Sequence, residues 1–85
     1  MKVYFYGNVL DYTRGEKMAE PDCANIRELV SALGKKFGKR FEDFLLGDKT
    51  CFFLVNGKGV MMTGGLDTRL GPDDRVEILL FADAG

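Results

Sequence analysis

Five segments of the chain show the hydrophobic pattern of extended structure: residues 2–6, 16–19, 51–55, 60–62 and 75–81. In the first segment, Val3 and Phe5 share one face of the predicted strand. Tyr4 and Tyr6 share the other face, where a phenol ring can pack while its hydroxyl stays in water. The second segment alternates weakly and predicts only a minor strand, and the fourth predicts a short extended piece.

Between the second and third of these segments, the apolar spacing changes from that of a strand to that of a helix. One apolar stripe runs along this stretch: Ile26, Leu29, Val30, Leu33 and Phe37. Asn25 is placed to cap the first turn, and Glu28 three residues later completes a capping box. Gly38 suits the end of this helix, and residues 41–45 predict a short second helical turn. The order of elements predicts an α+β fold with one main helix packed on one face of one sheet.

Composition and charge exclude several classes of function. The 85 residues suffice for one compact domain. With 12 basic and 13 acidic residues, the chain has no general positive field that would favour a nucleic acid or an anionic membrane. No apolar run approaches the ~20 residues of a membrane span, and the N-terminus lacks the pattern of a secretory signal. We therefore expect a cytoplasmic protein that binds neither nucleic acid nor membrane.

The side chains that usually carry catalysis or metal binding are scarce. The chain has no histidine, which excludes Ser-His and Cys-His nucleophile pairs and histidine metal sites. Cys23 and Cys51 lack the C-x-x-C spacing and are expected to be small buried or half-buried hydrophobic residues. The basic residues between positions 35 and 40 are expected to form a solvated helix end rather than a phosphate site. We expect no catalytic residue and no metal site.

Four segments of the sequence together carry a family resemblance. They are K-V-Y-F-Y at 2–6, A-N-I-R-E-L-V-S-A-L at 24–33, F-L-V-N-G at 53–57 and T-R-L-G-P-D-D-R-V-E-I-L-L-F at 68–81. With them the chain resembles, over nearly its whole length, the family of the small subunit of molybdopterin synthase (MoaD) and the thiamine-pathway sulfur carrier (ThiS). The combination of V-N-G with T-x-L and D-x-V is the most specific part. The resemblance implies a β-grasp, ubiquitin-like fold with one mixed sheet in residues 1–81, followed by a flexible C-terminal tail in residues 82–85.

The resemblance also implies a chemistry for the end of the chain. In this family an ATP-dependent, ubiquitin-activating-like enzyme adenylates the C-terminal glycine, which is then converted to a thiocarboxylate, so the carrier itself is not an enzyme. Gly85 falls on that glycine, and Ala84 stands where the family has a second glycine. Asp83 and Ala82 complete the tail that the activating enzyme would recognise. The resemblance implies no permanently bound cofactor, because the activating enzyme binds and uses the ATP.

The resemblance implies two kinds of partner, an adenylyltransferase related to ubiquitin-activating enzymes and a synthase that receives the sulfur. The synthase is either the large subunit of molybdopterin synthase or thiazole synthase. We expect the pathway of the molybdenum or tungsten pterin cofactor, with thiamine thiazole synthesis as the alternative. Two further alternatives stay open, a protein modifier that is joined to lysines and an interaction module that has lost the carrier chemistry.

The last predicted strand is apolar on both faces, which a sheet with one face in water does not require. Val76, Ile78 and Leu80 share one face, while Leu79 and Phe81 share the other. One interpretation is that loops cover this second face. The other is a partner surface made of Phe81, Leu79, Tyr4 and Tyr6, because large exposed apolar patches usually mark interaction sites.

Overall fold

The structure, a computed structural model, describes residues 1–47, 51–60 and 63–80. Within these ranges the strands form one five-stranded sheet in the order β2-β1-β5-β3-β4. The strands are β1 (Lys2–Phe5), β2 (Met18–Ala19), β3 (Cys51–Val55), β4 (Lys58–Gly59) and β5 (Arg75–Leu80). β1 and β5 are parallel, whereas the other neighbouring pairs are antiparallel. The predicted mixed sheet of the β-grasp fold is therefore confirmed.

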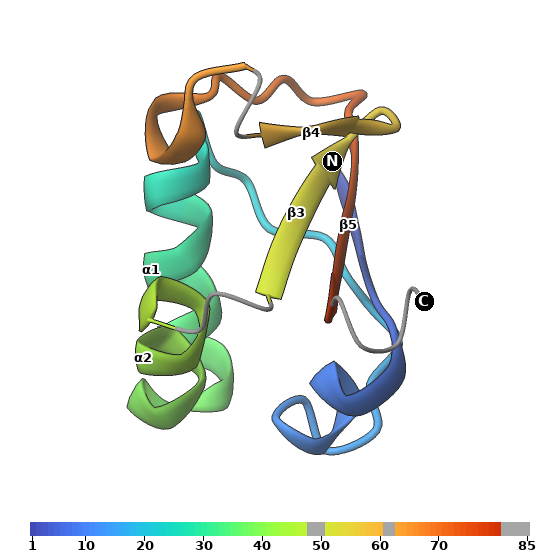
Figure 1. Cartoon of the computed structure of the whole chain (residues 1–85), viewed down its shortest axis with the longest axis vertical. Coiled ribbons are helices and arrows are strands. Elements are labelled where there is room, and N and C mark those ends of the chain that lie inside the picture. Colours follow the sequence, from blue (N-terminus) through green and yellow to red (C-terminus); the bar gives the residue numbers. More distant parts are fainter. Residues whose placement is uncertain (48–50, 61–62, 81–85) are drawn as a thin grey trace.

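Two helices lie together on one face of this sheet (Figure 1). They are α1 (Ile26–Phe37) and α2 (Lys39–Gly47). As predicted, the Asn25 side chain caps α1 by accepting a 2.8 Å hydrogen bond from the Glu28 backbone N–H. The returning bond differs from a regular capping box, because the Glu28 carboxylate accepts from the N–H of Ala24. Gly38 ends α1 with a φ of 114°, which favours glycine.

The predicted stripe of α1 packs against the inner face of the sheet. All five stripe residues are buried: Ile26, Leu29, Val30, Leu33 and Phe37. The inner face is formed by Val3 and Phe5 of β1 together with Val76 and Ile78 of β5, none of them more than 2 % exposed. The register places Val3 beside Val76 and Phe5 beside Ile78, so α1 covers two adjacent strands with one continuous apolar layer.

Several elements differ from the prediction in extent or position. For the two shortest strands, the extent depends on pairing with a neighbouring strand. The minor strand expected at 16–19 is reduced to β2, whose two residues pair with Val3 and Tyr4. The extended piece expected at 60–62 is wrong in position, since β4 precedes it and Val60 is helical. Residues 61–62 lie outside the described residues. A 3-10 helix, η1 (Gly7–Asp11), was not expected, and α2 is longer than one helical turn.

The residues of the V-N-G and D-x-V motifs hold two loops together. Asn56 has a φ of 52°, as the first turn residue after β3. Its side-chain oxygen accepts from the Arg75 backbone N–H at 3.0 Å, and its amide donates to Asp74 at 2.9 Å. The Asp74 carboxylate also accepts from the Gly71 N–H at 2.7 Å. The Gly71 bond, followed by the Asn56 bond, lowers the pKa of Asp74.

The T-x-L motif joins a second loop to the start of α1. The Thr68 carbonyl accepts from the Ile26 N–H at 3.1 Å, and the Leu70 N–H donates to the Ala24 carbonyl at 2.9 Å. Thr68 is buried, and its hydroxyl lies 3.1 Å from that of Thr63. The residues that carry the family resemblance are therefore largely those that fix the loops of the fold.

Gly34 provides a test of the contact between α1 and α2. A Cβ added at Gly34 would lie 2.8 Å from the Cβ of Glu42, so α2 would have to shift. We expect Gly34→Ala to lower the free energy of unfolding by about 1–3 kcal/mol, as overpacked sites do. Urea denaturation followed by circular dichroism measures this change.

Gly47→Ala is the matched control, because a Cβ there would meet nothing within 4 Å. We expect it to leave the stability unchanged or raise it by about 0.4–1 kcal/mol. If Gly34→Ala is at least as stable as Gly47→Ala, the close approach of the two helices is wrong.

Candidate functional site

The alternation of the strands gives the sheet an inner face, covered by the helices, and an outer face. We define the outer face by the side chains that alternate with the buried ones: Lys2, Tyr4, Tyr6, Met18, Phe52, Leu54, Arg75, Glu77 and Leu79. Tyr6 is 37 % exposed and Met18 is 40 % exposed. Tyr4, Leu54 and Leu79 are half-buried. Apart from Lys2, Arg75 and Glu77, the outer face is therefore aromatic and apolar.

The strand register arranges these side chains in two rows across the sheet. In the first row, Tyr4 pairs with Met18 on one side and with Glu77 on the other, and Glu77 pairs with Leu54. Residues that share a face in such directly opposite positions have Cβ atoms about 4.5–5.5 Å apart in antiparallel pairs. The row therefore continues across four strands.

The second row lies nearer to the end of β5. Phe52 pairs directly with Leu79. The Tyr6 backbone N–H donates to the Ile78 carbonyl at 3.1 Å, which brings Tyr6 next to Leu79. Tyr4, Tyr6 and Leu79, three of the four residues predicted for a partner surface, are thus brought together on one face. The fourth, Phe81, lies outside the described residues.

Arg75 holds the two tyrosines of the outer face. Its guanidinium carbon lies 4.1 Å from the centre of the Tyr4 ring, within the range of a cation–π interaction. The same guanidinium donates a 3.2 Å hydrogen bond to the Tyr6 hydroxyl and lies 3.9 Å from the Glu77 carboxylate. The bond to Tyr6 is the first cause of a raised pKa of Arg75, which stays charged at all ordinary pH.

Sequence reasoning missed Met18, Phe52, Leu54 and Arg75 as members of this surface. Residues 51–55 form a continuous apolar run without polar alternation, so the sequence could not say which side chains point outward. Arg75 reaches the tyrosines because β1 and β5 are neighbours in the sheet, although far apart in sequence. No local signal could have indicated this contact.

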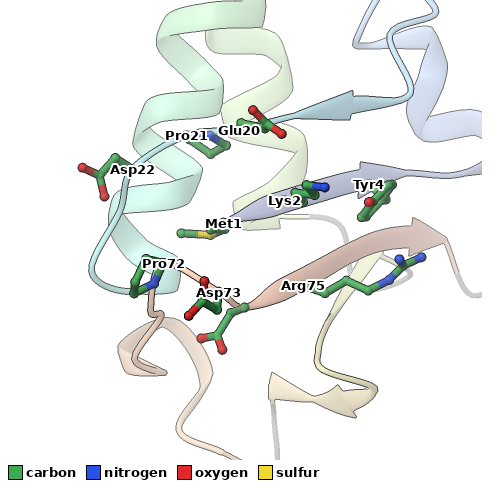
Figure 2. A pocket seen from close by; sticks show the side chains of 10 residues that line it. Met1, Lys2, Tyr4, Glu20, Pro21, Asp22, Pro72, Asp73 and Arg75 are labelled. Carbon is green, nitrogen blue, oxygen red and sulfur yellow. The ribbon is translucent and has the colours of Figure 1, made fainter.

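An open groove of about 720 Å³ adjoins the outer face at Tyr4 and Arg75. Figure 2 shows Glu20, Pro21 and Asp22 on one side of it and Pro72 and Asp73 on the other. Met1 and Lys2 lie between them. The groove is at the end of the sheet where β1 and β5 begin, and its rim is mostly acidic.

The two cysteines, Cys23 and Cys51, differ in burial. Cys23 is buried, and this burial, followed by the charges of Glu28 and Asp22, raises the pKa of its thiol. Cys23 therefore stays protonated at neutral pH. Cys51 is half-buried at the start of β3. The expectation of small buried or half-buried residues is met.

Among residues 1–47, 51–60 and 63–80, no group of three or more histidine, cysteine or acidic residues could hold a metal ion. No helix in these ranges is both long and apolar enough to cross a membrane.

Comparison with known proteins identifies the family to which the chain belongs. The sequence profile of the ThiS family matches residues 3–82. The chain belongs to this family of ubiquitin-like sulfur carriers. A comparison with curated protein sequences finds no significant match.

Solved structures similar to this ThiS-family chain share its fold. Mycobacterium tuberculosis CysO has a TM-score of 0.83 at 21% identity, covering 93% of this chain and 96% of that one. A chain of the Amycolatopsis orientalis BexX/CysO complex has a TM-score of 0.81 at 21% identity, covering 93% and 92%. The small archaeal modifier protein 1 (SAMP1) of Methanosarcina acetivorans has a TM-score of 0.80 at 20% identity, covering 99% and 94%. These likenesses confirm the β-grasp architecture.

The tail residues predicted for sulfur attachment and recognition stay predictions. Gly85, Ala84, Asp83 and Ala82 lie outside the described residues, as does the predicted boundary between residues 81 and 82. The family match itself extends to residue 82. Of the predicted site, the described residues therefore include only the outer face beside the end of β5.

Proposed function

We propose that this protein carries sulfur as a thiocarboxylate on its C-terminal Gly85, for molybdopterin biosynthesis. The observation that supports the sulfur-carrier role is the ThiS-family match over residues 3–82 on a β-grasp fold, and the choice of pathway is the sequence-based expectation. β5 is the central strand of the sheet and leads directly into the small-residue segment that ends at Gly85. A rigid strand in this position would present that segment to a partner enzyme.

The proposed chemistry takes place on the partner enzyme and uses its ATP. The Gly85 carboxylate attacks the α-phosphate of ATP, which gives an acyl-adenylate and releases pyrophosphate. A donor at the sulfide level, such as hydrosulfide, then attacks the acyl carbon, the bond to AMP breaks and AMP leaves, so that one carboxylate oxygen is replaced by sulfur. Adenylation is needed because a free carboxylate is a poor electrophile. The carrier needs no catalytic residue and no permanent cofactor for these steps.

The outer face is the proposed contact surface for the activating enzyme and the synthase. Burial of exposed apolar surface gives a partner protein affinity for the carrier. Because this surface lies beside the reactive end, it also fixes the orientation in which the partner binds that end. The structural relative in the BexX/CysO complex was crystallised together with another protein. We assign Tyr4, Tyr6, Leu79 and Phe81 to this contact, and we add Met18 and Leu54 from the structure.

A protein modifier is the second candidate, because one structural relative is named a small archaeal modifier protein. The two functions leave different products at Gly85. A carrier is recovered as the thiocarboxylate, whereas a modifier is recovered as an isopeptide adduct with a lysine. Intact mass spectrometry after incubation with ATP, the cognate activating enzyme and a sulfur donor distinguishes them.

The receiving pathway can be tested separately. If the adjoining genes encode a pterin-synthase large subunit, and that subunit accepts the sulfur in vitro, molybdopterin synthesis is supported. If a thiazole synthase is encoded there and accepts the sulfur, the thiamine alternative replaces it.

Leu79→Asp tests the outer face. A charge in the second row of this face should be disfavoured in an apolar interface, and we expect the affinity for the activating enzyme to fall about tenfold or more. Isothermal calorimetry measures the affinity, and circular dichroism checks that the variant stays folded.

Leu46→Asp is the matched control, since Leu46 is 54% exposed on α2, on the other side of the sheet. We expect its affinity to equal that of the unchanged protein. Equal binding by both variants would remove Leu79 from the contact. If Leu79→Asp unfolds, Tyr6→Asp at the more exposed position repeats the test.

A further inference from the structure

A second cavity, of about 400 Å³, lies between the segment after β1 and the junction of the two helices. It is lined by Asp11, Tyr12, Arg14, Phe37, Arg40 and Phe41. These residues come from three separate elements, so the cavity exists only in the folded chain. Its volume falls within the range of sites that hold ligands or side chains of a partner.

Aromatic rings form one wall of this cavity. Tyr12 stacks on Phe44 with ring centres 4.3 Å apart and on Phe41 at 5.5 Å. Phe37 meets Phe41 edge to face at 5.8 Å. Interlocked rings of this kind have little rotamer freedom, so the wall is rigid.

Arg40 lies against this wall. Its guanidinium carbon is 5.7 Å from the centre of the Tyr12 ring. The sequence alone predicts that Arg40 and three neighbouring lysines form a solvated helix end. In the structure, Lys36 lies 3.8 Å from Glu16 and Lys39 lies 3.1 Å from Asp43. Lys36 also lies over an aromatic ring, 5.5 Å from the centre of Phe37, but both lysines have acidic partners, and none of the ion pairs among the described residues includes Arg40.

Arg14 reaches the same cavity from a strained backbone position. Its φ of 56° lies in the left-handed region, which is strained for a residue other than glycine. The neighbouring Thr13 is completely buried, and its hydroxyl donates to the Glu16 carbonyl at 2.7 Å. The Gly15 N–H donates to the Leu10 carbonyl at 3.0 Å, which closes the loop. These bonds hold the turn that places Arg14.

The cavity has more positive than negative charge. Arg14 and Arg40 line the cavity together with one acidic residue, Asp11. Among the ion pairs and hydrogen bonds of the described residues, none joins either arginine side chain to a carboxylate. The whole sequence has a net charge of −1, so this excess is local. Two guanidinium groups in one cavity favour an anion that can accept from both.

The cavity lies at the end of the sheet where β1 and β5 finish. Phe5, the last residue of β1, has its ring centre 5.7 Å from that of Phe37 and 6.1 Å from that of Phe41. Phe5 pairs with Ile78, two residues before β5 ends at Leu80. A protein that engages the chain beyond Leu80 must therefore approach this end of the molecule.

We infer that this cavity receives an acidic side chain from the partner protein that engages the C-terminus, as a second contact beside the outer face. The inference rests on the proposed function for the identity of that partner. Arginine suits the role because its planar fork binds a carboxylate through two parallel hydrogen bonds. The aromatic wall excludes water from one side of the pair and strengthens it.

The inference can be tested with a capped pentaglutamate peptide as the probe. Two-dimensional NMR of the full chain follows the side-chain N–H signals of the arginines during the titration. We expect saturable shifts at Arg14 and Arg40. The variant Arg14→Asn with Arg40→Gln should weaken binding about tenfold or more. Asparagine is chosen at position 14 because it tolerates the left-handed conformation.

Two controls separate this site from general charge effects. Lys58→Gln with Arg69→Gln removes the same charge elsewhere and should leave the peptide affinity unchanged. Asp11→Asn removes the competing carboxylate and should raise the affinity about two- to fivefold.

Three outcomes would overturn the inference. The first is shifts spread evenly over all basic residues, and the second is equal weakening by the two double variants. The third is inorganic phosphate, at matched ionic strength, binding as tightly as the peptide, which would indicate a small-anion site. The titration needs no sulfur transfer, so its result is independent of whether Gly85 is loaded.

Discussion

Deleting Gly85 is expected to abolish sulfur loading. The deletion leaves Ala84 as the terminal residue, shortens the reach of the tail by about 3.5 Å, and puts a Cβ beside the reacting carbon. A displacement of this size exceeds what an adenylation site tolerates, since misplacement by about 1 Å can cost a hundredfold in rate. Intact mass after incubation with ATP, the activating enzyme and a sulfur donor measures the exchange of oxygen for sulfur.

The unchanged protein provides the reference for this experiment. If it folds, binds the activating enzyme and still never exchanges oxygen for sulfur, the carrier proposal is wrong. If the deletion variant loads as well as the unchanged protein, the sulfur is attached elsewhere, and the roles assigned to the tail fail with it.

Ala84→Gly is the companion variant, because family members have glycine at this position. A methyl group in a narrow channel costs about 1–3 kcal/mol, so its removal should speed loading about ten- to a hundredfold if the channel is tight. An unchanged rate would show a partner adapted to alanine. A slower rate would show that Ala84 is recognised in its own right.

Replacing Phe41 by alanine should have the largest effect on stability. Phe41 is 1% exposed, and its ring packs against Phe5, Tyr12 and Phe37, so it joins β1, the segment after η1, and α1. Truncations of buried phenylalanine usually cost about 3–5 kcal/mol. A domain of this length is stable by about 4–13 kcal/mol, so the variant would lose a large share of its stability.

Urea denaturation followed by circular dichroism measures this loss, with Phe44→Ala as the matched control. Phe44 belongs to the same helix and stacks on Tyr12 at 4.3 Å, but it is only half-buried. We expect its truncation to cost clearly less. Equal losses in the two variants would contradict the central position of Phe41 in the core.

The main elements of the fold could be predicted because their signals are local. The cap at Asn25, the apolar stripe of α1 and the glycine at position 38 lie within one short stretch of sequence. The alternation in β1 and β5 separated inner from outer side chains correctly, including Tyr4 and Leu79. Helix and strand periods are properties of neighbouring residues, so a single sequence is sufficient to read them.

The shortest elements could not be predicted in this way. β2 and β4 have two residues each and exist because a neighbouring strand supplies their hydrogen bonds. η1 has one buried residue, Val9, and no polar side-chain cap. Such elements have too few residues for a period to be seen, and their position depends on pairing with distant parts of the chain.

The sequence by itself determined the β-grasp class, the family likeness and the tail residues proposed to carry sulfur. The tertiary structure alone decided which distant side chains meet. It placed Arg75 on Tyr4 and Tyr6, added Phe52 and Leu54 to the outer face, and brought Arg14 and Arg40 to one cavity. Local patterns report which face a side chain occupies, whereas strand register and helix packing are set by contacts between residues far apart in sequence.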